Sequence, residues 1–168
     1  IAVFYSTAGE LITDGGITVA GIVAQTAAST LNYNLSASCG LFTGSNTASA
    51  PVTNLTCTLT TTGGPVVLAI IGDGQTATSS TIKLEPFLPA SSVNLIITVL
   101  RGVTNIYQTW WGVSNDTAIL DQQVNPSTIW TIDFLAAGTY TWTVEANVLN
   151  ANDRYTILNK KLFAYELK

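Results

Sequence analysis

Residues 137–148 carry the clearest structural signal in the chain, and they read Ala-Gly-Thr-Tyr-Thr-Trp-Thr-Val-Glu-Ala-Asn-Val. Apolar side chains occupy every second position, as at Tyr140, Trp142 and Val144, and polar side chains occupy the positions between them. Successive side chains of a strand point to opposite faces, so this period of two is typical of a strand with one buried face. A helix would scatter the pattern, because its period is about 3.6 residues. We therefore predict a half-buried strand over Thr139–Val148.

Comparable patterns recur along the chain, separated by residues that favour turns, among them Arg101-Gly102 and Gly63-Gly64-Pro65. We interpret the second of these as a hairpin turn. No stretch has the helical period, and an antiparallel jelly-roll sandwich of about eight strands fits this all-β pattern and the length best. The predicted strands are Ala2–Tyr5, Ile17–Val23, Leu31–Ala37, Val52–Thr62, Val66–Ile71, Thr81–Leu84, Val93–Leu100, Thr104–Trp111, Thr128–Phe134, Thr139–Val148 and Tyr155–Leu167.

The chain of 168 residues has the length of a single domain with a buried core of its own. Its first thirty residues are rich in glycine and alanine and have a weaker strand pattern. We predict an N-terminal arm or attachment segment over residues 1–30 and the jelly-roll domain over residues 31–168. A first strand followed by a long loop is the alternative for the N-terminal part.

Composition favours a surface that other subunits cover in part, and a polar but uncharged surface rich in threonine, serine and asparagine is the alternative. Apolar residues make up 47% and charged residues 10%, against roughly 25% charged residues in typical globular proteins. Such a neutral surface favours association. Two predicted strands, Val93–Leu100 and Leu162–Leu167, carry apolar residues on both faces, as strands at a subunit interface do. The candidate interface residues are Ile96, Leu100, Phe163, Tyr165 and Leu167.

Several kinds of chemistry have no support in the sequence. The chain has no histidine, which removes the commonest general base and the Ser-His-Asp type of catalysis. Carboxylates such as Asp133 and Glu145 could form a pair for glycoside hydrolysis, but they sit in no recognisable motif. We predict no enzymatic activity, no catalytic residues, no metal site and no cofactor. The net charge of −4, six scattered basic residues and short apolar runs also argue against nucleic-acid binding and membrane insertion.

Cys39 and Cys57 are the only cysteines. Alternation places Cys57 in phase with Leu55 and Leu59, and it places Cys39 in phase with the apolar residues of the predicted strand Leu31–Ala37, so both thiols are expected to point inward. Buried free thiols are one interpretation, and a disulfide between neighbouring strands is the other.

We expect ligand-facing residues in the polar loops between the strands, because such loops carry most binding functions. The loops are Thr43–Ala50, Asp73–Ser80 and Val113–Pro126, and the adjacent Trp110 and Trp111 precede the third. Adjacent strand residues point to opposite faces, so one tryptophan can face a ligand. Packing of both tryptophans inside the domain or at a subunit contact is the alternative. The candidate receptor-binding residues are Trp111, Asn115, Asp116 and Asp73.

Four segments, in the same order, resemble virus and phage fibre-tip domains. They are Val52–Leu68, Val99–Ile106, Asp133–Trp142 and Leu162–Leu167, although those domains commonly have a basic residue where this chain has Gly64. The domain is similar to the tumour necrosis factor and complement globular-head superfamily, whose jelly rolls form trimers.

This resemblance implies a homotrimeric, non-enzymatic structural protein on the virion surface, at a tail fibre or spike. Its implied partners are other virion structural proteins and a glycan or protein of the host surface. Two alternatives remain: a capsid decoration protein with no receptor role, and an extracellular trimeric ligand of the same fold.

Overall fold

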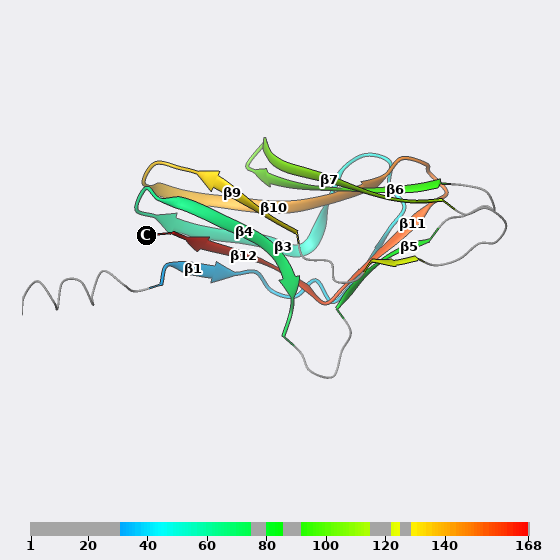
Figure 1. The fold of residues 1–168 in the computed structure, drawn as a ribbon, viewed down its shortest axis with the longest axis horizontal. Coiled ribbons are helices and arrows are strands. Elements are labelled where there is room, and N and C mark those ends of the chain that lie inside the picture. The colour runs from blue at the N-terminus through cyan, green and yellow to red at the C-terminus, as the bar shows by residue number, and fades with distance from the viewer. Residues whose placement is uncertain (1–30, 75–79, 86–91, 115–121, 125–128, 168) are drawn as a thin grey trace, which may run out of the picture. The chain divides into compact units, whose positions relative to one another are not determined.

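The structure is a computed structural model that describes residues 31–74, 80–85, 92–114, 122–124 and 129–167 (Figure 1). These residues form strands and turns and contain no helix, which confirms the all-β prediction. The predicted arm over residues 1–30, with its two predicted strands, lies outside the described residues. The strands are β1 (Tyr33–Leu35), β2 (Leu41–Gly44), β3 (Ala50–Thr61), β4 (Pro65–Gly72), β5 (Thr81–Glu85), β6 (Ser92–Arg101), β7 (Thr104–Ser114), β8 (Gln122–Val124), β9 (Ile129–Phe134), β10 (Gly138–Val148), β11 (Arg154–Leu158) and β12 (Lys160–Glu166).

The strands pair as a jelly roll. One sheet has the order β3-β10-β6-β7, and two shorter ladders have the orders β1-β12-β4-β9 and β2-β11-β5-β8, with every pairing antiparallel. The short ladders are consecutive halves of one sheet, because β1 leads to β2, β4 to β5, β8 to β9 and β11 to β12 in matching positions. With each such pair counted as one strand, the described chain pairs its first strand with its last, its second with its seventh, its third with its sixth and its fourth with its fifth. This nested pairing defines the jelly roll and confirms the predicted fold class.

The halved sheet bends along one line. Gly40 lies between β1 and β2 with a φ of 59°, and Asn159 lies between β11 and β12 with a φ of 51°. The Asn159 backbone N–H donates to the Gly40 carbonyl at 2.8 Å, and the Asp73 N–H after β4 donates to the Asn159 carbonyl at 2.9 Å. Left-handed φ values at Gly40 and Asn159 interrupt two of the strand ladders, and β4 ends at Gly72, opposite the start of β12, so three neighbouring strands break at the same level.

The core lies between the two sheets. From β3 and β10 it receives Leu55, Cys57 and Trp142, and from β4 and β12 it receives Leu68 and Leu162, all at most 2% exposed. The predicted inward phase of Leu55, Cys57 and Leu59 is thereby confirmed. Trp142 is 0% exposed, so the alternation in residues 139–148 correctly identifies a side chain that faces the core.

Asp133 and Glu166 are buried charges that join the two sheets. Asp133 on β9 receives hydrogen bonds from Arg101 Nη1 on β6 (2.6 Å) and from the Trp142 indole N–H on β10 (2.9 Å). Glu166 on β12 is 0% exposed, and its Oε1 accepts from the Thr62 and Gly64 backbone N–H groups at 2.7 and 3.0 Å.

Glu166 also accepts a hydrogen bond from the Asn32 amide at 2.6 Å and one from the Thr62 hydroxyl at 2.9 Å. Burial alone would raise the pKa of this carboxyl group. The hydrogen bonds from Asn32, Gly64 and Thr62 outweigh burial and lower the pKa from 4.5 to about 2. Glu166 is therefore an ionised group that ties the β3–β4 connection to the last strand.

Two local predictions are wrong. Gly63-Gly64-Pro65 is not a hairpin turn, because β3 pairs with β10 whereas β4 pairs with β12 and β9, so the segment crosses from one sheet to the other. The predicted strand Leu31–Ala37 is shortened to β1, in which Tyr33 and Leu35 are exposed. Cys39 is nevertheless buried, because the bend at Gly40 interrupts the alternation on which its phase was predicted. The Arg101-Gly102 hairpin between β6 and β7 is confirmed.

Candidate functional site

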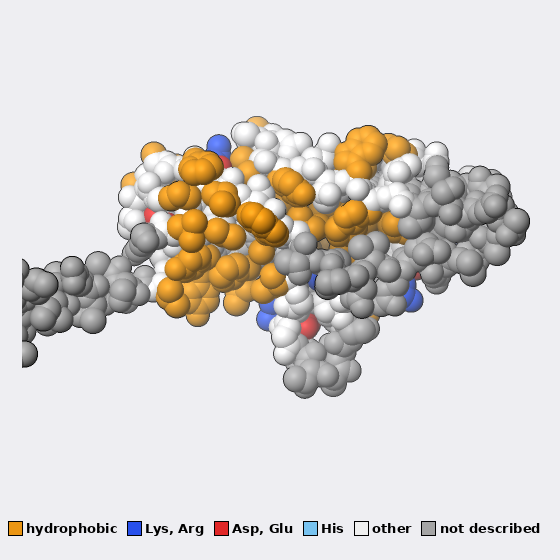
Figure 2. All heavy atoms as spheres, viewed as in Figure 1, with side chains coloured by type: hydrophobic (Ala, Val, Ile, Leu, Met, Phe, Trp, Pro, Cys, Tyr) orange, Lys and Arg blue, Asp and Glu red, His pale blue; other side chains and the backbone are white. Residues whose placement is uncertain are grey.

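The outer surface of the β1-β12-β4-β9 sheet is apolar, and we call it the apolar face. Strand register places its side chains in two rows across the sheet. The first row is Tyr33, Tyr165, Val67 and Ile132, and the second is Leu35, Phe163, Ala69 and Trp130, with Phe134 beside them. Figure 2 shows apolar side chains gathered over these strands.

Much of the apolar face is open to solvent in the single chain. Phe134 is 77% exposed, Trp130 63% and Tyr33 53%. Phe163 packs between two tyrosine rings, with centroid distances of 6.1 Å to Tyr33 and 6.2 Å to Tyr165. Lys161 is the one charged residue among the outward positions of the described strands of this sheet. A contiguous exposed apolar surface, unlike scattered single apolar residues, is the kind of surface that interaction sites present.

The five residues predicted for the subunit interface fall on two different sheets. Phe163 and Tyr165 lie on the apolar face, and Leu167 comes directly after β12 with 40% exposure. Ile96 and Leu100 lie on β6 in the other sheet. Ile96 is only 6% exposed within its own chain, which leaves little of its surface for a partner. At Ile96, the double coverage predicted for this strand is thus achieved inside one chain.

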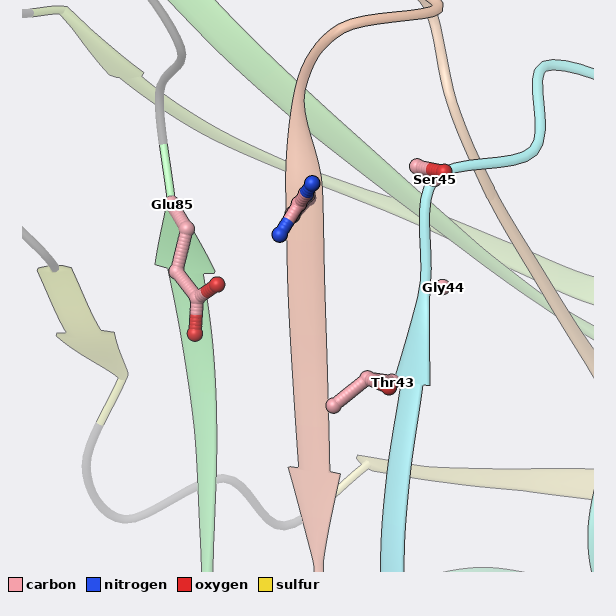
Figure 3. A pocket seen from close by; sticks show the side chains of 5 residues that line it. Thr43, Gly44, Ser45 and Glu85 are labelled. Carbon is pink, nitrogen blue, oxygen red and sulfur yellow. The ribbon is translucent and has the colours of Figure 1, made fainter.

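A polar pocket of about 270 Å³ lies on the other half of the bent sheet. Its lining residues come from β2 and the residue after it, from the end of β5 and from the start of β11, and they are Thr43, Gly44, Ser45, Glu85 and Arg154. In Figure 3 the labelled Glu85 lies on one side of β11, and Thr43 and Ser45 lie on the other.

The pocket combines a positive and a negative group that do not form an ion pair with each other. Glu85 and Arg154 are directly opposite in the β5–β11 register, yet no ion pair joins them in the described part of the chain. The Glu85 carboxylate instead accepts a hydrogen bond from the Thr156 hydroxyl at 3.1 Å. Lys83, two residues before Glu85 on β5, adds a second positive charge nearby. The arrangement suits a polar ligand with both donors and acceptors.

The predicted receptor-binding residues have mixed placements. Trp111 is half-buried and packs against the core, whereas Trp110 is 57% exposed, with its indole N–H 3.3 Å from the Gln108 amide oxygen. Asp73 lies at the bend of the sheet, where its carboxylate accepts from the Ser38 hydroxyl at 3.0 Å. Asn115 and Asp116 lie outside the described residues.

Sequence reasoning anticipated only part of the pocket. The predicted loop Thr43–Ala50 contains Thr43, Gly44 and Ser45, although the first two belong to β2. Glu85 and Arg154 were missed. The signal that could have identified them is a charged residue directly next to the end of each of two predicted strands.

The cysteines are free thiols. Cys39 and Cys57 are both buried, so the disulfide considered from the sequence is not formed in this structure. Burial raises the pKa of the Cys57 thiol to about 11, and it also raises the pKa of Cys39. Both side chains therefore remain protonated and pack as small apolar groups at neutral pH.

The described residues contain no carboxylate or metal cluster that suggests chemistry. Asp133 points into the core, whereas Glu145 lies between the inward-facing Val144 and Ala146, so these two carboxylates occupy opposite faces. No group of three or more potential ligands that could hold a metal ion occurs in the part of the chain that the structure describes. Within the same residues, no helix is long and apolar enough to span a membrane.

Comparisons with known proteins add likenesses of fold. No family profile and no curated protein matches the chain. Among solved structures, the chain is similar to Eiger TNF from S. frugiperda, at 12% identity and a TM-score of 0.47, over 82% of this chain and 93% of that one. It is also similar to the CBM22-1 xylan-binding domain of Paenibacillus barcinonensis Xyn10C, at 11% identity and a TM-score of 0.30, over 83% and 100%. At these values the likenesses carry no conclusion about function, and the nested strand pairing is what defines the chain as an all-β jelly-roll domain.

Proposed function

We propose that the chain is a non-enzymatic surface protein that assembles as a homotrimer through the apolar face and recognises a target through polar loops. The observation that carries the proposal is the row of exposed aromatic and aliphatic side chains on one sheet, with Phe134, Trp130 and Tyr33 more than half exposed. Aromatic residues are enriched at the centres of protein interfaces, and charged residues are depleted there. A single positive charge, that of Lys161, accompanies this face in the described strands.

The number of copies is proposed from the sequence resemblance. Jelly rolls of the tumour necrosis factor and complement globular-head type form trimers, and the four similar segments include Leu162–Leu167, which supplies Phe163 and Tyr165 to the apolar face. A closed threefold arrangement would cover the face of every copy equally.

The setting is proposed from the same resemblance: a fibre or spike of a virus particle, where the trimer adheres to the host surface alongside other virion structural proteins. Polar loops support this role, because they vary without disturbing a rigid sandwich. The alternatives are capsid decoration without a receptor and an extracellular trimeric ligand of the same fold.

Molar mass tests the assembly. Sedimentation velocity of the full chain at micromolar concentration should give about three times the chain mass of 17.7 kDa. A stable monomer would refute the proposal, and a dimer would retain the apolar face as an interface but refute the threefold arrangement.

Cell labelling and location test the setting. The fluorescent trimer should label host cells, and replacing Thr47–Ser49 by glycine and serine residues should abolish labelling while the mass stays unchanged. A trimer that labels no host and is distributed over a capsid lattice would support decoration instead. A trimer that occurs outside any virus particle and binds a cell-surface protein would support the extracellular ligand.

A further inference from the structure

The Arg154 guanidinium is the group of the polar pocket that decides which ligand it can bind. Arg154 is exposed at the start of β11, and its side chain forms no hydrogen bond or ion pair with any described residue. Its cross-strand neighbour Glu85 has the opposite charge, but the carboxylate is held by Thr156 at 3.1 Å. A guanidinium presents its N–H donors in a rigid, planar fork that fits a carboxylate with two parallel hydrogen bonds. The unpaired fork is therefore available to an external carboxylate.

Hydroxyl groups line the pocket, and the spacing of the strands sets its width. β11 separates β2 from β5, so the two walls stand about 9.6 Å apart, which is twice the spacing of neighbouring strands. Thr43 and Ser45 offer hydroxyl groups on one side, and Glu85 offers acceptor oxygens on the other. The pocket volume of about 270 Å³ lies just below the range of roughly 300 to 1000 Å³ that is common for small-molecule sites. The space suits one ring rather than a chain of several.

We propose that this pocket binds a terminal acidic sugar, a single ring that carries one carboxylate and several hydroxyls. The carboxylate pairs with the Arg154 fork, the ring hydroxyls exchange hydrogen bonds with Thr43 and Ser45, and one further hydroxyl donates to Glu85. A neutral sugar leaves the guanidinium without a carboxylate, and a bare carboxylate makes no hydrogen bond to Thr43, Ser45 or Glu85. This inference rests on the recognition part of the proposed function and gives it a ligand class.

Affinity at one site is expected to be weak, because the pocket is shallow and polar, and several copies on one particle strengthen attachment by acting together.

Ligand-observed NMR on the full chain tests the inference with three probes: glucuronate, glucose and acetate. Glucuronate should give saturation transfer and a measurable dissociation constant, and glucose and acetate should bind at least tenfold more weakly. Arg154→Ala should weaken glucuronate binding at least tenfold. Lys83→Ala removes the same charge from a residue outside the pocket lining, so it is the matched control and should change the affinity less than threefold.

Three outcomes would overturn the inference: no glucuronate binding, equal binding of glucose or acetate, or equal losses in the two variants. A measurement of molar mass distinguishes failure of this binding inference from failure of the proposed trimer. The two can fail independently because Arg154 lies on a different half of the sheet from the apolar face. A trimer that does not bind glucuronate refutes the inference alone, and a monomer that binds it refutes the trimer alone. Circular dichroism confirms that both variants are folded.

Discussion

The two sheets of the sandwich bury similar side chains on their inner surfaces but present different chemistry on their outer ones. The β1-β12-β4-β9 sheet presents the apolar face, with Phe163 and Tyr165 at its centre. The paired strands β3 and β10 present threonines whose hydroxyls meet across the strands, at 2.8 Å for Thr58–Thr141 and for Thr60–Thr139. Both outer surfaces belong to strands with the same alternation, so alternation alone identifies the core and not the partner.

The hydrogen-bonded threonines show what a water-facing surface of this fold looks like. Thr56 and Thr143 extend the row, with hydroxyls 3.3 Å apart, and all six threonines stand on the outer side of the sheet. Threonine satisfies the strand preference for β-branched residues and keeps a polar group toward solvent. The apolar face has no such row of β-branched residues with hydroxyl groups toward solvent, which is why we assign it to a partner.

The largest effect is expected from placing a charge on the apolar face. Tyr165→Asp should dissociate the trimer, because a carboxylate buried at an interface without a partner costs several kcal/mol. Sedimentation velocity should show the mass falling to one third. Thr58→Asp places the same charge on the threonine surface and should leave the mass unchanged, so equal behaviour of the two variants would contradict the assignment of the faces.

A smaller effect is expected where the sheets are joined through the core. Asp133→Asn should lower the free energy of unfolding by about 2 to 3 kcal/mol, because one of the two donors, Arg101 or Trp142, then faces an N–H₂ group and the other keeps only a neutral acceptor. Urea unfolding at a fixed protein concentration measures the loss. Glu145→Gln makes the same change of charge at a carboxylate without an ion pair to a described residue, and an equal loss there would show that net charge is responsible.

Glu166 provides the next smaller effect and a pH dependence. Glu166→Gln should cost about 1 to 2 kcal/mol at pH 7, because the amide keeps an acceptor but brings its N–H₂ group toward Asn32. The pKa of the folded carboxyl is lowered to about 2, so its stabilising contribution is complete above pH 4.5 and disappears as the pH falls toward 2. The difference between wild type and variant in urea unfolding should close over that interval, and a difference that persists at pH 2 would contradict the assigned role.

The smallest effect is expected on the threonine surface. Thr141→Val should change the free energy of unfolding by less than about 0.5 kcal/mol, because water replaces the lost partner of Thr58. Val144→Thr makes the reverse change on the inner side of the same strand and should cost about 1 to 3 kcal/mol. Thermal unfolding of the two variants measures the contrast, which would fail if Thr141→Val were the more damaging.

The sequence predicts the inner surfaces well, because one local rule governs them. Trp142, Leu55 and Cys57 are buried as their alternation indicates. The rule fails where φ becomes positive, as at Gly40 and Asn159, since each such residue resets which side chains point inward. Partner strands are also not encoded locally, which is why Gly63-Gly64-Pro65 was interpreted as a hairpin although it crosses between sheets.

The candidate sites were harder to predict, because they depend on residues that are distant in sequence. Phe163 and Tyr165 were identified, but Tyr33 and Trp130 join them only through strand pairing. In the pair of tryptophans, alternation shows that the two side chains diverge but does not show which one faces inward.

The bend at Gly40, Asp73 and Asn159 has a consequence for how such a protein can diversify. It divides one sheet into an apolar half and a half with the polar pocket, and both halves draw on the same strands. A substitution at Thr43, Glu85 or Arg154 therefore alters one half without touching the side chains of the other. Under the proposed function, selection on attachment and selection on assembly would act on separate residues within a single domain, so new specificities would arise without rebuilding the proposed oligomer.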